Sequence, residues 1–198
     1  MHRSIASLIF AAVVLVLTTY AQDYTKLQFA DCGSKSTDII NVDIKPMPLY
    51  NPGPAFFSFN AILKRPVKTV KVSLDIIRSV NGIKLPVKCY IVNGQNVGSC
   101  TYPDLCAFLQ GILTEFSPEN CPAALAEYGI DCTCPFDIKP QTINLIDHPI
   151  DLPDATQTAA TFLASGNFNM TVTVSEVDPS APAPYGCGKV AFTVKQKK

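Results

Sequence analysis

The chain has 198 residues, with 16 basic and 16 acidic side chains, eight cysteines and two histidines. Its formal net charge of zero argues against a nucleic-acid binder, because such proteins need excess lysine and arginine to displace counterions from phosphate. A hydrophobic fraction of 47% with only 16% charged residues excludes a disordered chain.

Residues 1–21 have the layout of a secretory signal peptide. A short basic start is followed by ten unbroken apolar residues, Leu8–Leu17, and small residues lead to a cleavage point after Ala21. The alternative, a membrane anchor, needs about 20 apolar residues to span a bilayer, roughly twice the length present. We therefore expect a soluble mature chain, 22–198, that forms a single domain.

Two short runs near the start of the mature chain, Ile39–Ile44 and Phe56–Leu63, are rich in β-branched and aromatic residues. Such residues fit the pleated surface of a sheet. Both runs are therefore weak strand candidates.

The clearest local pattern is a β-hairpin within residues 70–91. Apolar and polar residues alternate through Val70–Ile76 and again through Ile83–Ile91, on either side of Asn81-Gly82. Asparagine and glycine accept the positive φ of a tight hairpin turn. The second strand contains Pro86, which cannot donate to a strand ladder, so this strand is expected at a sheet edge or bulged.

Two helices are expected next. Thr101 and Asp104 resemble a capping box, and six apolar residues within 105–116 recur at spacings of three and four. A shorter helix is predicted over Pro122–Tyr128, with Gly129 as its C-terminal stop.

The C-terminal part returns to strand patterns. Thr142–Ile146 is a weak candidate, whereas Phe168–Val174 and Val190–Val194 alternate clearly. Residues 154–166 fit a third helix or a loop, since the apolar residues share a face but the threonines disfavour a helix. The recurrence of short strands and turns predicts a mainly β fold, an antiparallel cup or sandwich with one or two short helices.

Catalytic chemistry has little support in the sequence. His148 is the one histidine that remains after the signal peptide, it is interpreted as a partly exposed loop residue, and no Gly-x-Ser-x-Gly motif occurs. The pair Asp147 and Asp151 would suit glycosidase chemistry, but a chain with 16 acidic residues offers many such pairs. We therefore expect no catalytic residues and no cofactor, with a weak lipid hydrolase that depends on His148 as an alternative.

The eight cysteines are expected to form disulfides. Cys121, Cys132 and Cys134 would offer thiolate ligands to zinc, but an even number of cysteines in a secreted chain favours disulfides over a metal site. The residues alone leave the pairing open. No metal site is expected.

Asn169-Met170-Thr171 is the one N-glycosylation sequon of the chain. Asn169 lies on the polar side of its predicted strand, where a sugar would face water. We expect glycosylation of Asn169, with an unused sequon as the alternative.

The apolar residues allow two interpretations. They can fill an ordinary core, or they can line the hydrophobic cavity of a cup-shaped sheet that holds lipid acyl chains. The positions expected at such a cavity or its rim are Phe57, Phe59, Val72, Leu74, Ile76, Ile83, Leu109, Ile112, Phe162, Leu163, Phe168, Met170 and Val172.

Several strings resemble the ganglioside GM2 activator family of sphingolipid activator proteins. They are Gly98-Ser99-Cys100-Thr101-Tyr102 before Cys106, Cys121-Pro122, Tyr128-Gly129-Ile130-Asp131-Cys132-Thr133-Cys134-Pro135-Phe136, Leu152-Pro153, Gly166-Asn167-Phe168 and Gly186-Cys187. The resemblance runs from about Asp31 to Val194, with all eight cysteines in the family order. The family's rim carries tryptophans where this chain has Ile83 or its neighbour and Phe162-Leu163.

The resemblance implies an ML-like β-cup that encloses a hydrophobic cavity and lifts single glycosphingolipids from membranes. It implies that a lysosomal β-hexosaminidase-type hydrolase then receives the lipid, and that contact with the membrane surface is transient. It also implies the disulfides Cys32–Cys187, Cys89–Cys100, Cys106–Cys134 and Cys121–Cys132.

The leading hypothesis is therefore a secreted or lysosomal lipid carrier and enzyme activator. The alternative is a secreted interaction protein, such as a defence, venom or signalling factor, that keeps the fold and uses its outer face. In both cases the chain is expected in the secretory pathway.

Overall fold

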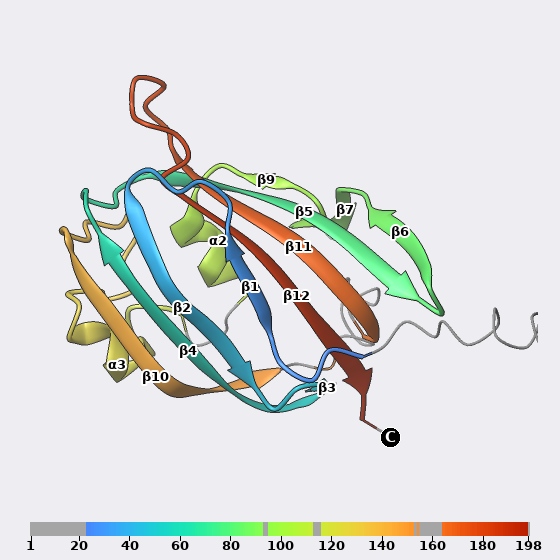
Figure 1. The fold of residues 1–198 in the computed structure, drawn as a ribbon. Coiled ribbons are helices and arrows are strands. Elements are labelled where there is room, and N and C mark those ends of the chain that lie inside the picture. The colour runs from blue at the N-terminus through green and yellow to red at the C-terminus, as the bar shows by residue number, and fades with distance from the viewer. Residues whose placement is uncertain (1–22, 93–94, 113–115, 153, 155–163, 198) are drawn as a thin grey trace, which may run out of the picture.

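A computed structural model describes residues 23–92, 95–112, 116–152, 154 and 164–197. The expected signal peptide lies outside these ranges. Within them, the strands form a seven-stranded sheet, a three-stranded sheet and a two-stranded ribbon (Figure 1). The mainly β, antiparallel architecture and the two short helices predicted from the sequence are confirmed.

The larger sheet has the strand order β1-β12-β11-β5-β6. Its main strands are β1 (Gln28–Asp31), β5 (Val70–Val80), β6 (Ile83–Val87), β11 (Gly166–Glu176) and β12 (Gly186–Gln196). Two short strands complete it, β3 (Leu49–Asn51) parallel to β12 and β9 (Thr101–Tyr102) antiparallel to β5.

The smaller sheet has the order β10-β4-β2 and is antiparallel throughout. Its strands are β2 (Thr37–Lys45), β4 (Gly53–Leu63) and β10 (Gln141–Leu152). All three extend beyond the weak candidates read from the sequence, and β10 gains six residues at its C-terminal end. This extension includes His148, so the interpretation of His148 as a loop residue is wrong.

The predicted hairpin is confirmed as β5 and β6. Asn81 and Gly82 have φ angles of 51° and 80°, the left-handed conformation that this tight turn requires. Strand β6 is the edge of the sheet order, as Pro86 indicates.

The expected strand over Ile83–Ile91, however, stops early. Strand β6 ends at Val87, and the chain turns into a separate ribbon of β7 (Tyr90–Val92) and β8 (Gln95–Val97). Gly98, directly after β8, lies against the segment between β6 and β7, because its φ is 104° and a Cβ there would lie 2.2 Å from the Lys88 carbonyl oxygen.

Helix α2 (Leu105–Ile112) and helix α3 (Ala123–Ala126) lie at the end of the molecule opposite the tip of the β5–β6 hairpin (Figure 1). The capping-box interpretation of α2 is wrong in detail, because Thr101 belongs to β9 and Asp104 caps the helix. Asp104 Oδ1 accepts a hydrogen bond from the Cys106 amide at 2.9 Å. Helix α3 is shorter than the predicted run 122–128, because it ends at Ala126, and Gly129, with φ of 66°, lies in the turn that follows it.

The expected helical run over 105–116 is shorter than predicted. Helix α2 ends at Ile112, Leu113 lies outside the described residues, and Phe116 is buried beyond the helix. Most of the segment 154–166, expected as a helix or a loop, also lies outside the described residues.

Buried apolar side chains gather in two clusters between the sheets. The cluster at the helix end, called the closed end here, contains Leu63, Val67, Val70, Cys106, Phe116, Ile130, Cys132, Phe136, Ile138, Ile143 and Tyr185. The second cluster contains Leu49, Ala55, Ile76, Phe168 and Val194. Because each cluster contains residues of both sheets, the two sheets are held together at two separate places.

Candidate functional site

The larger sheet presents an apolar face to the smaller sheet. Val70 and Ile76 of β5 and Phe168 of β11 belong to the buried clusters, so alternation places Leu74, Met170 and Val172 on the same inner face. Register pairs Leu74 with Val172 and Ile76 with Met170. The sequence-predicted residues of β5 and β11 therefore form one continuous apolar surface.

The smaller sheet contributes two aromatic rings to the opposite wall. Phe57 and Phe59 lie two residues apart on β4 and stack with ring centroids 6.3 Å apart at an interplanar angle of 11°. Phe59 is paired with Leu145 of β10, which packs on the closed-end cluster. The two phenylalanines therefore share the inner face of β4 with the buried residues Ala55 and Ala61.

Buried and partly exposed side chains alternate along this interior. Phe168, Val72 and Ile76 are 0%, 2% and 5% exposed, respectively. In contrast, the predicted residues Phe57, Phe59, Leu74, Met170 and Val172 are all partly exposed although they face the opposite sheet. Inner-face side chains that remain accessible indicate a space that protein atoms do not fill completely.

The remaining predicted positions are dispersed. Leu109 of α2 packs against the closed-end cluster, and Ile83 lies at the hairpin tip, 63% exposed. The side chain of Ile112 and the residues Phe162 and Leu163 lie outside the described part of the structure.

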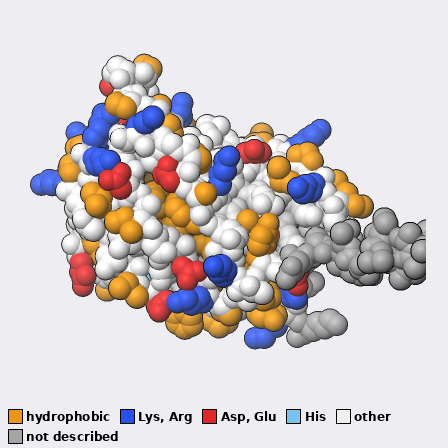
Figure 2. All heavy atoms as spheres, in the orientation of Figure 1, with side chains coloured by type: hydrophobic (Ala, Val, Ile, Leu, Met, Phe, Trp, Pro, Cys, Tyr) orange, Lys and Arg blue, Asp and Glu red, His pale blue; other side chains and the backbone are white. Residues whose placement is uncertain are grey.

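Exposed apolar side chains gather where β6 and β7 meet, and we call this region the hairpin end. It comprises Ile83, Leu85, Tyr90 and Ile91, which are 63%, 52%, 52% and 76% exposed. Lys84 and Lys88 are exposed among them, and Figure 2 shows hydrophobic and basic side chains together at the end where β6 lies.

Sequence reasoning found only Ile83 in this region. Leu85 and Ile91 belong to an alternating pattern, which predicts burial on the apolar face of a sheet. These side chains are exposed instead, because β6 lies at the sheet edge and the chain leaves the sheet after Val87.

Arg78 is a charged residue at the inner face that sequence reasoning also missed. On β5 it is paired with Phe168 on one side and with Leu85 of β6 on the other. Its Nε donates a hydrogen bond of 2.8 Å to the carbonyl oxygen of Ser165. Arg78 therefore lies on the boundary between the apolar interior and the hairpin end.

The groups needed for a hydrolytic triad are not brought together. A bulge between Leu145 and His148 gives Asp147 a φ of 46° and turns it to the outer face, where Ser58 Oγ donates to its carboxylate at 3.1 Å. His148 is instead paired with Phe57 and faces the interior. Asp147 and His148 therefore lie on opposite faces of β10, and in the described part of the chain Ser58 contacts a carboxylate but no imidazole, so a Ser-His-Asp arrangement is not formed.

Four disulfides join Cys32–Cys187, Cys89–Cys100, Cys106–Cys134 and Cys121–Cys132. These are the pairs that the family resemblance implies. Cys121, Cys132 and Cys134 are thereby engaged in disulfides rather than presented as thiolates. Among the described residues, no group of three or more His, Cys, Asp or Glu side chains is arranged to hold a metal ion.

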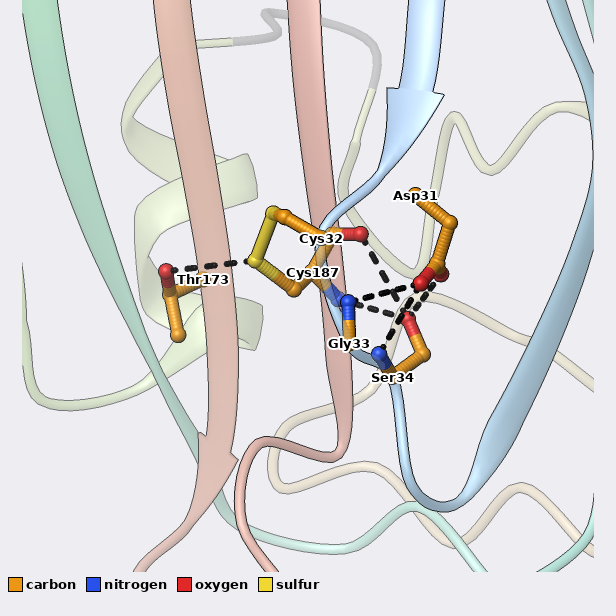
Figure 3. The surroundings of a disulfide bond; sticks show 6 residues. All are labelled: Asp31, Cys32, Gly33, Ser34, Thr173 and Cys187. Carbon is orange, nitrogen blue, oxygen red and sulfur yellow. Dashed lines mark hydrogen bonds between the residues drawn. A yellow bond between two sulfur atoms is a disulfide. The ribbon is translucent and has the colours of Figure 1, made fainter.

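The Cys32–Cys187 disulfide is surrounded by a polar network (Figure 3). Asp31 Oδ1 accepts hydrogen bonds from the amides of Gly33 and Ser34, at 2.7 and 3.1 Å, and its other oxygen accepts one from the Ser34 hydroxyl. These bonds, led by the Ser34 hydroxyl, lower the pKa of Asp31. Ser34 Oγ in turn accepts a hydrogen bond of 2.8 Å from the Cys187 amide, so the network ties the segment between β1 and β2 to β12.

Comparison with known proteins agrees with this architecture. The ML domain family model matches residues 26–193, nearly the whole described chain. The chain belongs to the ML domain family, a family of lipid-binding proteins. Within the described residues, no helix is long and apolar enough to cross a membrane.

Two relatives of this ML domain protein are ganglioside GM2 activators. The mouse (Mus musculus) protein is 29% identical over 168 residues, which cover 83% of this chain and 79% of the relative. The Macaca fascicularis protein is 27% identical over 173 residues, covering 83% and 80%. The resemblance to this family read from the cysteine-rich strings is thus confirmed.

A solved structure with a similar outline is a Niemann-Pick type C2 protein from the Japanese carpenter ant. It matches 86% of this chain and 99% of its own chain, at 14% sequence identity and a TM-score of 0.40.

Proposed function

We propose that this ML domain protein is a non-enzymatic lipid carrier that holds the acyl chains of one lipid between its two sheets. The observation that carries the proposal is the interior itself, whose apolar inner-face side chains stay partly accessible beside the buried clusters. Phe57, Leu74 and Met170 face this interior from opposite walls. Walls that are mainly apolar suit an acyl chain.

The hairpin end is the proposed site of transient membrane contact. Ile83, Leu85 and Ile91 expose apolar surface that has no other described cover, and such surface favours the bilayer interface. Lys84 and Lys88 add attraction to anionic headgroups, at about 1 kcal/mol per basic residue near such a surface. The chain as a whole is neutral, so this attraction is local and allows release.

In its finer form, the proposal is that the protein extracts single glycosphingolipids and presents them to a hydrolase of the β-hexosaminidase type. The names of the two ganglioside GM2 activators support this form. Arg78, on the boundary of the interior, supports a contact with a polar headgroup. The proposed locations are the secretory pathway and then the lysosome or the extracellular space.

A filling variant tests the carrier function. Leu74→Trp places a bulky ring on the inner face of β5, whereas Lys71→Trp places the same ring on the outer face of the same strand. We expect lipid to copurify with the wild type and with Lys71→Trp in native mass spectrometry. Leu74→Trp is expected to carry less lipid and to transfer labelled glycolipid between vesicles several-fold more slowly.

Equal lipid occupancy and transfer in both tryptophan variants would refute the proposed interior site. Protein that stays lipid-free and moves no lipid would refute the carrier function as a whole. A saturable protein receptor whose binding ignores added lipid would favour the secreted interaction protein instead.

The presentation step has its own test. Purified β-hexosaminidase is given ganglioside GM2 in vesicles, with and without this protein, and product is measured. Faster hydrolysis with the wild type but not with Leu74→Trp supports presentation. Lipid transfer without faster hydrolysis would retain the carrier and reject this hydrolase as its partner.

A further inference from the structure

A shallow groove crosses the outer face of the larger sheet, on the side opposite to the apolar interior. Strands β1, β12, β11 and β5 form its floor. Two rows of outward side chains line it, Ile77, Asn169, Ala191 and Gln28 in one row and Asp75, Thr171, Lys189 and Ala30 in the next. The proposed lipid carrier has no use for this groove, because a sheet separates it from the interior.

The groove contains the whole glycosylation sequon. Asn169 and Thr171 are two residues apart on β11, so both side chains face the groove, while Met170 between them faces the interior. The Tyr24 hydroxyl donates a hydrogen bond to Asn169 Oδ1 at 3.4 Å. An N-linked sugar is attached through Nδ2, so this bond holds the side chain in place without using the atom that carries the sugar.

The walls of the groove suit the first sugar of a glycan. Ala191, directly opposite Asn169, and Ala30 have the smallest side chains among the residues that line the groove, so they leave room beside the acceptor. Ile77 offers an apolar surface on the other side of Asn169. Asp75 and Lys189, on either side of Thr171, place a carboxylate and an ammonium within the same groove, and these groups hydrogen-bond sugar hydroxyls.

We propose that Asn169 carries an N-linked glycan whose first N-acetylglucosamine lies in this groove. The proposal rests on the secretory route of the proposed function, because N-glycans are added in that pathway. The glycan covers the outer face of the larger sheet and leaves the hairpin end free. Contact with a membrane or a hydrolase is thereby confined to the other surfaces of the protein.

The first part of the test is the mass of the secreted protein. The full chain is expressed in a eukaryotic host that makes oligomannose glycans and is collected from the medium. Wild type and Thr171→Ser keep the sequon and are expected to carry one glycan at Asn169. Thr171→Val and Asn169→Gln remove the sequon by two routes and are expected to carry none.

The second part locates the first sugar by hydroxyl-radical footprinting. An endoglycosidase trims the glycan to one N-acetylglucosamine, and oxidation of Ile77 and Tyr24 is compared with that in Thr171→Val. We expect several-fold slower oxidation of both residues in the one-sugar form. Phe56, 46% exposed on the outer face of the smaller sheet, is the internal control and should react equally in both forms.

Secreted wild type without a sugar on Asn169 would overturn the proposal. So would a one-sugar form in which Ile77 and Tyr24 react as fast as in Thr171→Val. Wild type that stays in the cell with residues 1–21 attached overturns the secretory route as well. Lipid transfer by the Thr171→Val protein is measured in parallel, so the failure of the glycan and the failure of the carrier are told apart.

Discussion

The closed end and the hairpin end of this protein contain similar kinds of residue in opposite states. At the closed end, Phe116 and Phe136 are 5% and 6% exposed and meet edge to face with ring centroids 5.9 Å apart. At the hairpin end, Ile83 and Ile91 are 63% and 76% exposed. Both ends are apolar, so composition does not distinguish them.

Covalent and hydrogen-bonded restraints make the difference. Cys106–Cys134 and Cys121–Cys132 join α2 and the segment before α3 to one turn, and Cys32–Cys187 ties the segment after β1 to β12. Strand β6 contains no cysteine, and its described partner strand is β5 alone. A restrained end suits a scaffold, and an uncovered end suits reversible contact with a membrane.

The largest expected effect is the loss of an aromatic side chain from the closed end. Phe136→Ala should lower the free energy of unfolding by about 3–5 kcal/mol, because it removes a buried ring and leaves a cavity. Leu85→Ala at the hairpin end should change it by less than about 0.5 kcal/mol. Urea unfolding measures the free energy of unfolding of both variants, and equal decreases would contradict the distinction between the two ends.

The second effect is the removal of a disulfide. Replacing Cys106 and Cys134 together by alanine should cost about 2–4 kcal/mol of stability. Replacing Cys89 and Cys100 should cost less, because this pair closes a loop of sequence separation 11 rather than 28. Thermal unfolding of the two double variants, with the remaining disulfides checked by mass, measures which variant loses more stability. A larger loss on removing Cys89–Cys100 would contradict the prediction.

A third and smaller effect concerns membrane binding. The double variant Ile83→Ser/Leu85→Ser should bind vesicles at least about tenfold more weakly, since withdrawing even one of the two apolar side chains from a membrane costs about 1.5 kcal/mol. Val177→Ser, 56% exposed outside the hairpin end, is the matched control and should bind as the wild type does. Vesicle cosedimentation measures this, and unchanged binding of the double variant would remove the hairpin end from the proposed contact.

The comparison also shows which features can be predicted from sequence. Local chemistry determined the β5–β6 turn, since Asn81 and Gly82 tolerate positive φ wherever they occur. Alternation likewise placed Leu74 and Met170 on one face. Both features depend on neighbours in the chain, which are visible in the sequence.

Features that depend on distant contacts were missed. The bulge at Asp147 turns His148 inward, and it is held by Ser58, 89 residues away. Ile91 continues an alternating pattern, yet it is exposed because the chain leaves the sheet at Val87. Burial of an alternating residue requires an opposing layer, and no local pattern states whether that layer extends far enough.

The smallest expected effect tests the polar network at the closed end through its pH dependence. Hydrogen bonds from Ser34 and Gly33 lower the pKa of Asp31 below its ordinary value of 3.8 in the folded protein. The ionised carboxylate therefore stabilises the fold fully above pH 3.8, and this contribution is lost as the pH falls through the lower folded pKa.

Asp31→Asn should be slightly less stable than the wild type near neutral pH, and the difference in stability should vanish in acid. Ser34→Ala should show the same trend, because it removes the hydroxyl that lowers the pKa most. Thermal unfolding between neutral pH and about pH 2 measures both variants. A difference that stays constant over this range would mean that Asp31 acts through its shape and not through its charge.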